Sequence, residues 1–292
     1  AAAFAGTPFD IDRERTADLL GFDGVVRNSM DAAAGRDFLA EATAALATHA
    51  VTVSGLAEDL VLFANKGYVD LDDAYASTSS IMPQKVNPDS LELVRAVAGD
   101  AVGGLTGLLT TLKGLPRAYN RDLQRATPHA WETVDAVAEA TAVAAGAVGS
   151  ASWPVETLAA AAGEGFSTAT GVADALAMAG VPFRTAHEVL AAAAERADDG
   201  TPDVDTLDSV AADVLGASLF EYVPRDRVEA VLDPRESVAT RDSAGGPAPA
   251  RVAADLESAS AGVDADAAAL SDRRDALADA ADALEREVAR YV

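Results

Sequence analysis

Apolar residues recur along much of the chain at alternating intervals of three and four. The first such series, within residues 28–65, consists of Leu39, Ala42, Leu46, His49, Val53, Leu56, Leu60 and Phe63. Because residues three and four apart share one face of an α-helix, this spacing predicts a helix of roughly ten turns with a single apolar seam.

Three more long helices are predicted in the same way. After Pro88 the seam consists of Leu91, Val94, Ala98, Ala101, Leu105, Leu108 and Leu112. On that helix Gly99, Gly103 and Gly107 recur every four residues and allow a neighbouring backbone to approach closely. The third helix is predicted over residues 122–148. The last has an apolar residue at every seventh position, at Leu256, Val263, Leu270, Leu277 and Leu284.

Helices of this length bury their seams only against partners of similar length, which predicts a bundle within the chain or between subunits. Beyond Trp153 the predicted helices become short and are interrupted by Gly and Pro, as at residues 180–182 and 200–202. We therefore predict a central helical bundle over residues 1–153 and a smaller helical C-terminal domain over residues 154–292 that ends in a long helix. We find no convincing strand pattern, so the predicted fold class is all-α.

The composition indicates which residues build the core and the salt conditions in which the protein works. Half of the residues are apolar but only 5% are aromatic, so the core must be built from Ala, Val and Leu. The 47 acidic and 22 basic residues give a net charge of −25. Charge of this size repels itself in the compact state, and concentrated salt screens that repulsion. We interpret the chain as a salt-adapted, halophilic cytoplasmic protein rather than a mildly acidic mesophilic one, and we exclude nucleic acid as a partner because no basic stripe is present.

Three further features limit where the protein works. It has no cysteine, which excludes disulfides and thiolate metal sites. No signal peptide opens the chain, and its most apolar stretch, residues 101–112, is too short to span a bilayer, so we predict a soluble protein with no membrane partner. The chain begins with Ala1 rather than methionine and without a helix cap, and we interpret it as trimmed or fragmentary.

The segment that carries candidate chemistry is residues 77–88, STSSIMPQKVNP, between two predicted long helices. Small hydroxyl residues followed by proline predict a loop, with Asn87 capping the next helix and Pro88 in its first position. The amides of that helix start, together with Lys85, would favour an anion. Residues 79–127 carry six basic and four acidic side chains and are therefore net positive in a chain that is strongly negative. This could mark an anion-binding region, or it could be an ordinary fluctuation of surface charge.

This loop resembles the signature loop of the fumarase/aspartase superfamily. The segments LKGLPRAYNRDLQ, RNSMDAAAGRDF and VPFRTAHEVL are similar to the argininosuccinate lyase family in particular, and the likeness extends over nearly the whole chain. The loop and LKGLPRAYNRDLQ together form a highly specific pair. The resemblance implies a long-helix central bundle of the fumarase/aspartase type and β-elimination of argininosuccinate to L-arginine and fumarate, a step of arginine biosynthesis.

The resemblance also implies roles for individual residues. Ser79 matches the catalytic serine, Lys85 the lysine placed near it, and Glu92 a glutamate that orients and charges a histidine of another subunit. The positions that match substrate-binding residues are Ser80, Asn87, Tyr119 and Gln124. Without the resemblance, each would have an ordinary explanation, such as a loop hydroxyl for Ser79 or a favourable acidic residue near a helix start for Glu92.

The chain departs from the family pattern at two positions. Thr78 replaces a glycine and is expected to stiffen the loop. Thr127 replaces a lysine that binds a carboxylate of the substrate, and Arg125 could bind that carboxylate instead. None of the three histidines stands in a Thr-His-x-Gln setting like that of the catalytic histidine. His49 lies in a seam and is interpreted as a core residue, and His129 and His187 lie in predicted helices. No histidine pair has metal-ligand spacing, so we predict no metal and no cofactor.

Active sites of the family are shared between subunits of a homotetramer, and its members carry an amino-terminal domain that precedes the matched segments. We therefore expect the 292 residues alone to be nearly inactive. One alternative is another fumarate-releasing lyase of the superfamily, such as a fumarase, an adenylosuccinate lyase or a muconate cycloisomerase, against which LKGLPRAYNRDLQ counts. The other is a non-catalytic, crystallin-like structural protein, against which intact Ser79, Lys85 and Asn87 count.

Overall fold

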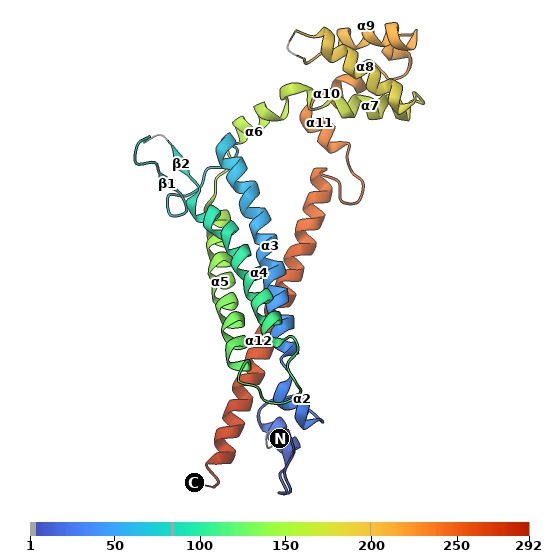
Figure 1. The fold of residues 1–292 in the computed structure, drawn as a ribbon. Coiled ribbons are helices and arrows are strands. Elements are labelled where there is room, and N and C mark those ends of the chain that lie inside the picture. Colours follow the sequence, from blue (N-terminus) through green and yellow to red (C-terminus); the bar gives the residue numbers. More distant parts are fainter. Residues whose placement is uncertain (1–3, 83–84, 199, 292) are drawn as a thin grey trace. The chain divides into compact units, whose positions relative to one another are not determined.

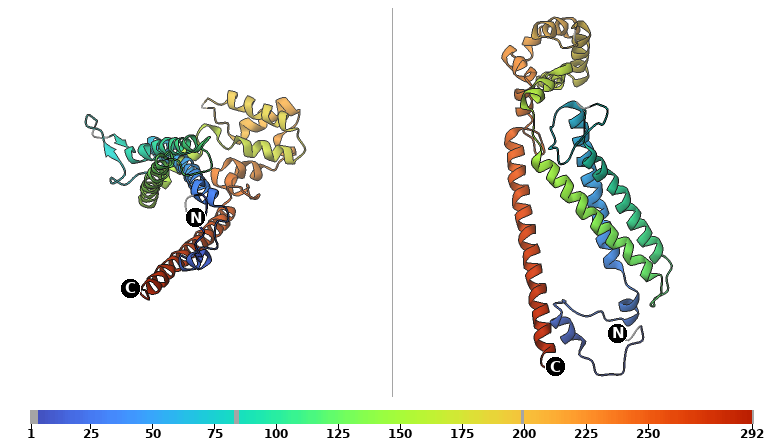
Figure 2. Two further views of the ribbon diagram at one scale, coloured as in Figure 1. Left: turned by 60° about the horizontal axis from the view of Figure 1, so that its bottom comes forward. Right: turned by 90° about the vertical axis from the view of Figure 1, so that its left-hand side faces the viewer.

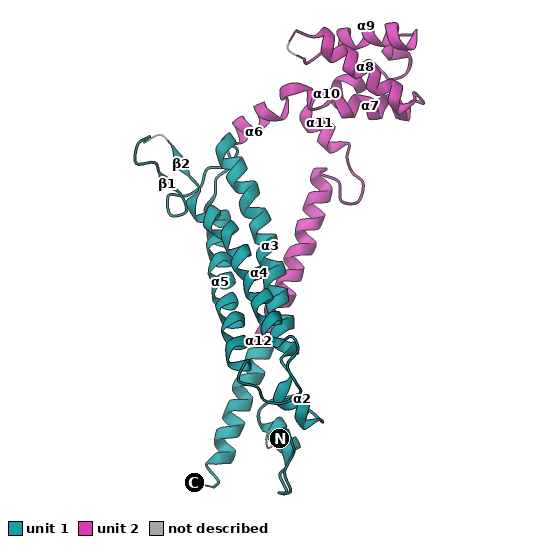
Figure 3. Cartoon of the chain, in the orientation of Figure 1, with its two compact units in different colours: residues 1–154, 273–292 teal, residues 155–272 magenta. Residues whose placement is uncertain are grey.

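The computed structural model describes residues 4–82, 85–198 and 200–291. Regular structure in this part of the chain is almost entirely helical, which confirms the predicted fold class (Figure 1). The chain forms two compact units, one of residues 1–154 with 273–292 and one of residues 155–272 (Figure 3). Pro83 and Gln84, which belong to the predicted loop, lie outside the described residues.

The first unit is built on a bundle of three long helices, α3 (Asp37–Lys66), α4 (Asp89–Leu112) and α5 (Leu123–Ser150), which lie side by side (Figures 1 and 2). Its core consists mainly of Ala47, Ala50, Ala57, Leu60, Val61, Val69, Leu91, Val94, Ala101, Val137, Ala140, Ala144 and Ala147. Alanine leaves little side chain between two backbones, so a core of this composition holds the three helices close together.

The predicted seam of α4 is confirmed, because Leu91, Val94, Ala101 and Leu108 are its buried residues. The helix predicted over residues 122–148 is also confirmed, as α5. Proline at position 128 is accommodated inside this helix, one and a half turns from its start. The first helix therefore buries the face that its sequence predicts, and the second forms within about two residues of its predicted bounds.

The predicted seam of residues 28–65 is wrong in two respects. The segment breaks after α2 (Ser29–Ala34), so α3 begins only at Asp37. The buried residues of α3 are Thr43, Ala47, Ala50, Ala57, Leu60 and Val61, of which only Leu60 was a predicted seam position. The small residues face α4 and α5, and the larger seam residues Leu56 and Phe63 remain 44% and 41% exposed.

His49 illustrates the same correction. It was predicted to be a core residue, but its side chain is exposed and its Nε2 lies 3.0 Å from the hydroxyl oxygen of Thr141 on α5. The imidazole is satisfied by this contact at the surface of the bundle.

Gly104 provides a test of the close packing between α4 and α5. A Cβ at this position would lie 2.1 Å from the Thr133 hydroxyl and 3.1 Å from the His129 carbonyl oxygen. We expect Gly104→Ala to lower the free energy of unfolding by about 1–3 kcal/mol, because the buried Thr133 must move. The matched control is Gly103→Ala, where a Cβ meets no atom of the chain. Thermal unfolding of both variants checks this, and equal stability would contradict the packing described.

The ends of the first unit are joined by a contact between α1 (Arg13–Leu19) and the end of α12 (Pro249–Val288). Arg15 Nη2 lies 2.6 Å from Glu287 Oε1, and this hydrogen bond holds the pKa of the Glu287 carboxyl below its ordinary value. Because the pKa of Glu287 is lower in the folded state, the contact stabilises the fold at every pH above the ordinary carboxylate pKa. This stabilisation is lost as the pH falls through the lowered pKa of the folded state.

The second unit consists of short helices around its own core. They are α6 (Val155–Ala162), α7 (Ala169–Met178), α8 (Phe183–Arg196), α9 (Val204–Leu215), α10 (Arg225–Leu232) and α11 (Pro234–Ala239), with 3₁₀ turns η1 (Glu164–Phe166) and η2 (Leu219–Glu221). The fully buried residues of this core include Val172, Leu176, Ala186, Val189, Leu207, Val210, Leu219 and Val228.

The long final helix predicted near the end of the chain is present as α12, with 40 residues. The heptad positions Leu256, Val263, Leu270, Leu277 and Leu284 all lie within this helix, where a repeat of seven places them along one face. A regular apolar stripe on a helix this long favours a partner helix.

Two helices, α3 and α4, are long and apolar enough to cross a membrane by length and composition alone. The stretch 101–112 that looked too short is the second half of α4. Both helices contribute residues to the core of the bundle, and core helices of water-soluble proteins pass the same test.

Candidate active site

The predicted loop is closed at its base by a very short hairpin that the sequence did not predict. Strand β1 (Ser77–Thr78) pairs antiparallel with β2 (Val86–Asn87) (Figure 1). Two residues per strand are too few to produce a visible alternation of apolar and polar positions, so the sequence carried no strand signal. We refer to residues 77–88 as the serine loop.

Ser79 lies directly after β1, and its hydroxyl is an acceptor for two backbone amides. The N–H groups of Ile81 and Met82 lie 3.3 and 3.2 Å from Ser79 Oγ. The Ser79 amide donates to the Lys85 carbonyl at 3.0 Å, which fixes the residue within the turn. Hydrogen bonds donated to an oxygen favour its anionic form, so this arrangement would stabilise a Ser79 alkoxide.

The base of the serine loop is attached to the start of α4. The Ser77 hydroxyl donates a hydrogen bond to the Asp89 carboxylate. The predicted helix cap at Asn87 is wrong, because Asn87 lies in β2 and α4 begins at Asp89, with the buried Pro88 in the capping position. Pairing with Ser77 holds Asn87 in the extended conformation, which leaves its side chain available for another role.

The charged residues expected beside Ser79 lie around the same end of the bundle. Lys85 closes the loop through its backbone, with an amide that donates to Met82 at 2.9 Å, and its side chain is exposed. Glu92 lies in the first turn of α4 and is exposed. The neighbouring Arg95 forms an ion pair with Glu58 of α3. Ser80 is exposed beside Ser79.

The other predicted site residues lie in the connection between α4 and α5. Gln124 Nε2 donates a hydrogen bond of 2.8 Å to the hydroxyl of Tyr119, whose ring is 54% exposed. The Asn120 amide bridges two carbonyl oxygens of the same connection, at Pro116 (3.0 Å) and Ala118 (3.1 Å). We refer to residues 116–124 as the tyrosine turn.

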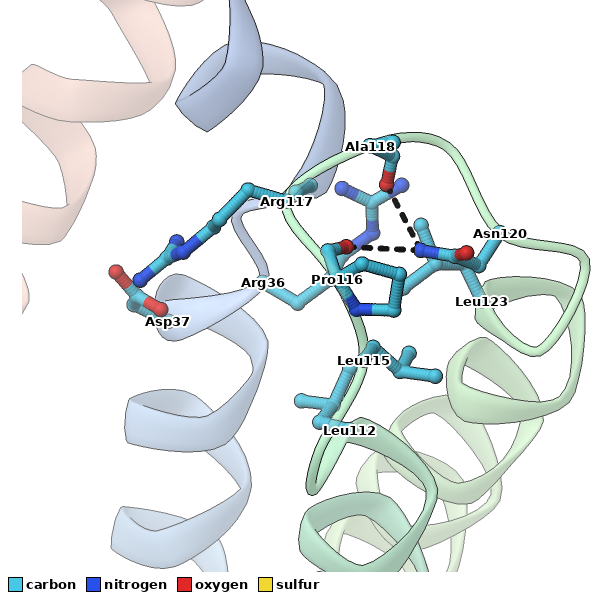
Figure 4. Close-up of a pocket in the computed structure, with 10 residues that line it drawn as sticks. Arg36, Asp37, Leu112, Leu115, Pro116, Arg117, Ala118, Asn120 and Leu123 are labelled. Atoms are coloured by element: carbon cyan, nitrogen blue, oxygen red, sulfur yellow. Dashed lines mark hydrogen bonds between the residues drawn. The ribbon is translucent and has the colours of Figure 1, made fainter.

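A cavity of about 190 Å³ separates the tyrosine turn from the start of α3 (Figure 4). Its polar lining comes from Arg36, Asp37, Arg117 and Asn120. Arg117 extends across its mouth toward α3, and it also pairs with Asp31 at 3.3 Å.

The serine loop and the tyrosine turn lie at opposite ends of α4 (Figure 1). This helix has 24 residues, so at about 1.5 Å per residue the two groups are separated by about 36 Å. Ser79, Lys85 and Glu92 are therefore brought together at one end of the bundle, and Tyr119 and Gln124 at the other. No substrate of ordinary size reaches both groups within one chain.

Family models and known proteins match most of the chain. The family described as "Lyase" matches residues 1–103, and the family described as "Argininosuccinate lyase C-terminal" matches residues 166–239. Argininosuccinate lyases of Haloarcula marismortui and Natronomonas pharaonis are 64% and 68% identical to the chain over its whole length. The chain belongs to the argininosuccinate lyase family.

The chain spans 59% of the length of each of these two relatives. Among solved structures, an EDDS lyase variant with bound fumarate is 34% identical, with a TM-score of 0.88 over 99% of this chain and 59% of that one. A class II fumarase from Schistosoma mansoni, at 16% identity and a TM-score of 0.58, covers 72% of this chain and shares the fold. Both covered parts lie within helical lyases of the fumarase/aspartase superfamily.

Two positions depart from the argininosuccinate lyase pattern. Thr78 lies in β1, opposite Val86, where its β-branched side chain suits an extended backbone. Thr127 lies in α5, and its hydroxyl donates to the Leu123 carbonyl of its own helix at 3.4 Å. Arg125 is exposed on the same turn.

Two residues that organise the serine loop and the tyrosine turn were not singled out from the sequence. Asp89 follows the signature loop and holds its base through Ser77, and Asn120 organises the tyrosine turn. The position of Asn120 between Tyr119 and a helix start was the available signal, because asparagine side chains commonly bond to nearby backbone groups in turns. Within the described residues, no three histidine, aspartate or glutamate side chains are grouped to hold a metal ion.

Proposed function

We propose that this chain supplies the catalytic serine loop and the tyrosine turn of an enzyme that splits argininosuccinate into L-arginine and fumarate. The observation that carries the proposal is Ser79, whose hydroxyl accepts hydrogen bonds from two backbone amides within the sequence SSIMPQKVNP. The relatives at 64–68% identity are argininosuccinate lyases, which supports this substrate.

The reaction requires a base, a way to hold negative charge and a proton for the leaving nitrogen. Ser79, as the alkoxide, takes the proton from the succinyl carbon next to a carboxylate. The electron pair moves into that carboxylate, which briefly carries a second negative charge, and then forms the double bond of fumarate as the carbon–nitrogen bond breaks. The guanidino nitrogen leaves with a proton as arginine.

Lys85 stabilises negative charge near Ser79, and the amides of Ile81 and Met82 favour its alkoxide. Glu92, at the surface of the same end of α4, orients and charges a histidine that comes from another subunit, as the resemblance implies. The side chains that hold the substrate are Ser80, Asn87, Tyr119 and Gln124.

We further propose a homotetramer in which each active site is shared between subunits. The separation of about 36 Å between the serine loop and the tyrosine turn supports this assembly, because an antiparallel arrangement of two copies of α4 brings the ends together. The heptad stripe of α12 supports it as well, since a long helix with such a stripe packs against a partner helix.

The remaining partners follow from charge and composition. The net charge of −25 favours a small-molecule substrate and disfavours nucleic acid. We place the enzyme in the cytoplasm, without a membrane partner, and as salt-adapted, in keeping with relatives from Haloarcula marismortui and Halobacterium salinarum.

One specific observation favours a second candidate. The EDDS lyase structure resembles the chain with a TM-score of 0.88 and holds fumarate, so another fumarate-releasing reaction is the alternative. Asn87, Tyr119 and Gln124 can hold a succinyl group whichever amine is attached to it.

The test compares fumarate release from several substrates in concentrated potassium chloride. We use the chain joined to the part of the Haloarcula marismortui relative that it does not cover, called the joined enzyme below. The substrates are argininosuccinate, adenylosuccinate, EDDS and malate. We expect kcat/KM for argininosuccinate to exceed the others by about a hundredfold or more, because unpaired polar groups in a site penalise the wrong substrate. A higher value for any other substrate would reassign the function.

A further inference from the structure

Tyr119 and Gln124 have little around them that could hold them in place. The Tyr119 ring is 54% exposed, and the Gln124 side chain is also exposed. Their mutual hydrogen bond of 2.8 Å couples the two side chains to each other but not to the bundle. Their position therefore depends on the backbone of the tyrosine turn.

The side-chain amide of Asn120 bonds twice to that backbone, in addition to the backbone–backbone bonds of the turn. Its Nδ2 donates to the carbonyl oxygens of Pro116 (3.0 Å) and Ala118 (3.1 Å), as the dashed lines in Figure 4 show. The backbone carbonyl oxygen of Asn120 accepts the N–H of Leu123, the first residue of α5, at 3.1 Å, a bond that does not depend on the side chain. Asn120 thus connects the backbone immediately before Tyr119 to the start of the helix that carries Gln124.

The cavity beside the turn makes this bridge more important. Because a space of about 190 Å³ lies between the turn and the start of α3, packing does not support the turn from that side. Arg117 reaches across the space, but its ion pair with Asp31 at 3.3 Å joins two exposed side chains, and such pairs contribute little. The bridge made by Asn120 is the ordered connection.

We propose that Asn120 is a positioning residue, which presets Tyr119 and Gln124 to receive the succinyl substrate. The proposal rests on the proposed function and adds to it a residue that does not itself need to touch substrate. A preset turn avoids the cost of ordering its backbone when substrate binds. A displacement of about 1 Å in a binding group can lower the rate about a hundredfold, so loss of the bridge should be visible in the kinetics.

The test is Asn120→Ala in the joined enzyme, with Asn65→Ala as the matched control. Asn65 also donates its amide to a backbone carbonyl, that of Val61 at 3.1 Å, but within α3 and in neither the serine loop nor the tyrosine turn. We expect Asn120→Ala to raise KM for argininosuccinate about thirtyfold with kcat within about threefold of wild type, because it weakens binding rather than the proton transfer. Asn65→Ala should leave KM unchanged. A fall in kcat without a change in KM would indicate general loss of folded enzyme and would overturn the proposal.

A double-mutant cycle with Tyr119→Phe provides a second readout. If Asn120 acts through Tyr119 and Gln124, then Asn120→Ala should raise KM by less than about threefold once the Tyr119 hydroxyl is absent. Equal effects in the two backgrounds would mean that Asn120 acts independently of Tyr119, which would also overturn the proposal.

Amide hydrogen exchange of the 292-residue chain separates this inference from the proposed function. We expect exchange in residues 116–124 to be about tenfold faster in Asn120→Ala than in wild type, with α3 unchanged. Unchanged exchange overturns the inference whatever the enzyme does. If exchange is faster in Asn120→Ala but the unsubstituted joined enzyme releases no fumarate from argininosuccinate, the proposed function is overturned, and with it the role of Asn120 for substrate.

Discussion

Ser79→Ala is expected to lower kcat for fumarate release by the joined enzyme about 10²- to 10⁴-fold, the size of effect associated with loss of a general base. The two amides of Ile81 and Met82 lie within hydrogen-bonding distance of the hydroxyl oxygen that this substitution removes. The backbone bond from Ser79 to Lys85 does not involve the side chain, so the turn itself should persist. Binding should change little, because the substrate is held by other residues, and KM is expected within about threefold of wild type.

The matched control for this substitution is Ser150→Ala. Ser150 likewise has a hydrogen-bonded hydroxyl, which donates to the Gly146 carbonyl at 2.9 Å, but it lies at the end of α5 and belongs to neither the serine loop nor the tyrosine turn. Initial rates at saturating argininosuccinate are the measurement. A Ser79→Ala enzyme that keeps more than about a tenth of the wild-type kcat would exclude Ser79 as the base.

The sequence predicted the helices of the bundle well but not every packed face. The seam of α4 holds in the structure because its large residues Leu91 and Leu108 are the ones that pack inside the chain. In α3 the rule fails, because Ala47, Ala50 and Ala57 give closer contact with α4 and α5 than the larger seam residues would. A heptad pattern shows that an apolar face exists and does not show whether the chain itself or another copy covers it.

The serine loop shows a different limit of prediction. Residue types identified Ser79 and Lys85 through the family resemblance, but the hairpin at the base of the loop has too few residues to give a pattern. Asparagine is a residue type that often caps helices, but pairing of Asn87 with Ser77 in the hairpin overrides that local preference. The bond from Ser77 to Asp89 joins groups twelve positions apart, which spacing rules for a helix or strand do not cover.

The sequence also could not show that the candidate residues fall into two groups. Tyr119 lies 40 positions from Ser79 in the sequence, a separation compatible with contact or with a long distance. The unbroken length of α4, Asp89–Leu112, shows that Ser79 and Tyr119 lie far apart within one chain. The proposal of a site shared between copies rests on that helix length.

A shared site makes a second large effect possible, the recovery of activity from two inactive proteins. Ser79→Ala removes the base at one end of α4, and Gln124→Ala removes a substrate contact and the partner of the Tyr119 hydroxyl at the other. In a mixed assembly, some sites receive an intact serine loop from one variant and an intact tyrosine turn from the other. For random mixing of equal amounts, about a quarter of the sites are intact.

This recovery requires that subunits exchange and that each site takes its two groups from different chains. The control is a protein with both substitutions in one chain, mixed with either single variant, because such mixtures contain no site with two intact groups from the required copies. Subunits are exchanged by dilution into low salt and return to concentrated potassium chloride, since screening of the net charge of −25 should favour assembly.

Fumarate release by the mixture of Ser79→Ala and Gln124→Ala joined enzymes tests most directly the claim that one lyase site is built from the serine loop and the tyrosine turn of different copies. The account predicts about a quarter of the wild-type rate after exchange, against nearly none for either variant alone. A mixture that remains as inactive as its components, although mixed oligomers are present, would contradict it.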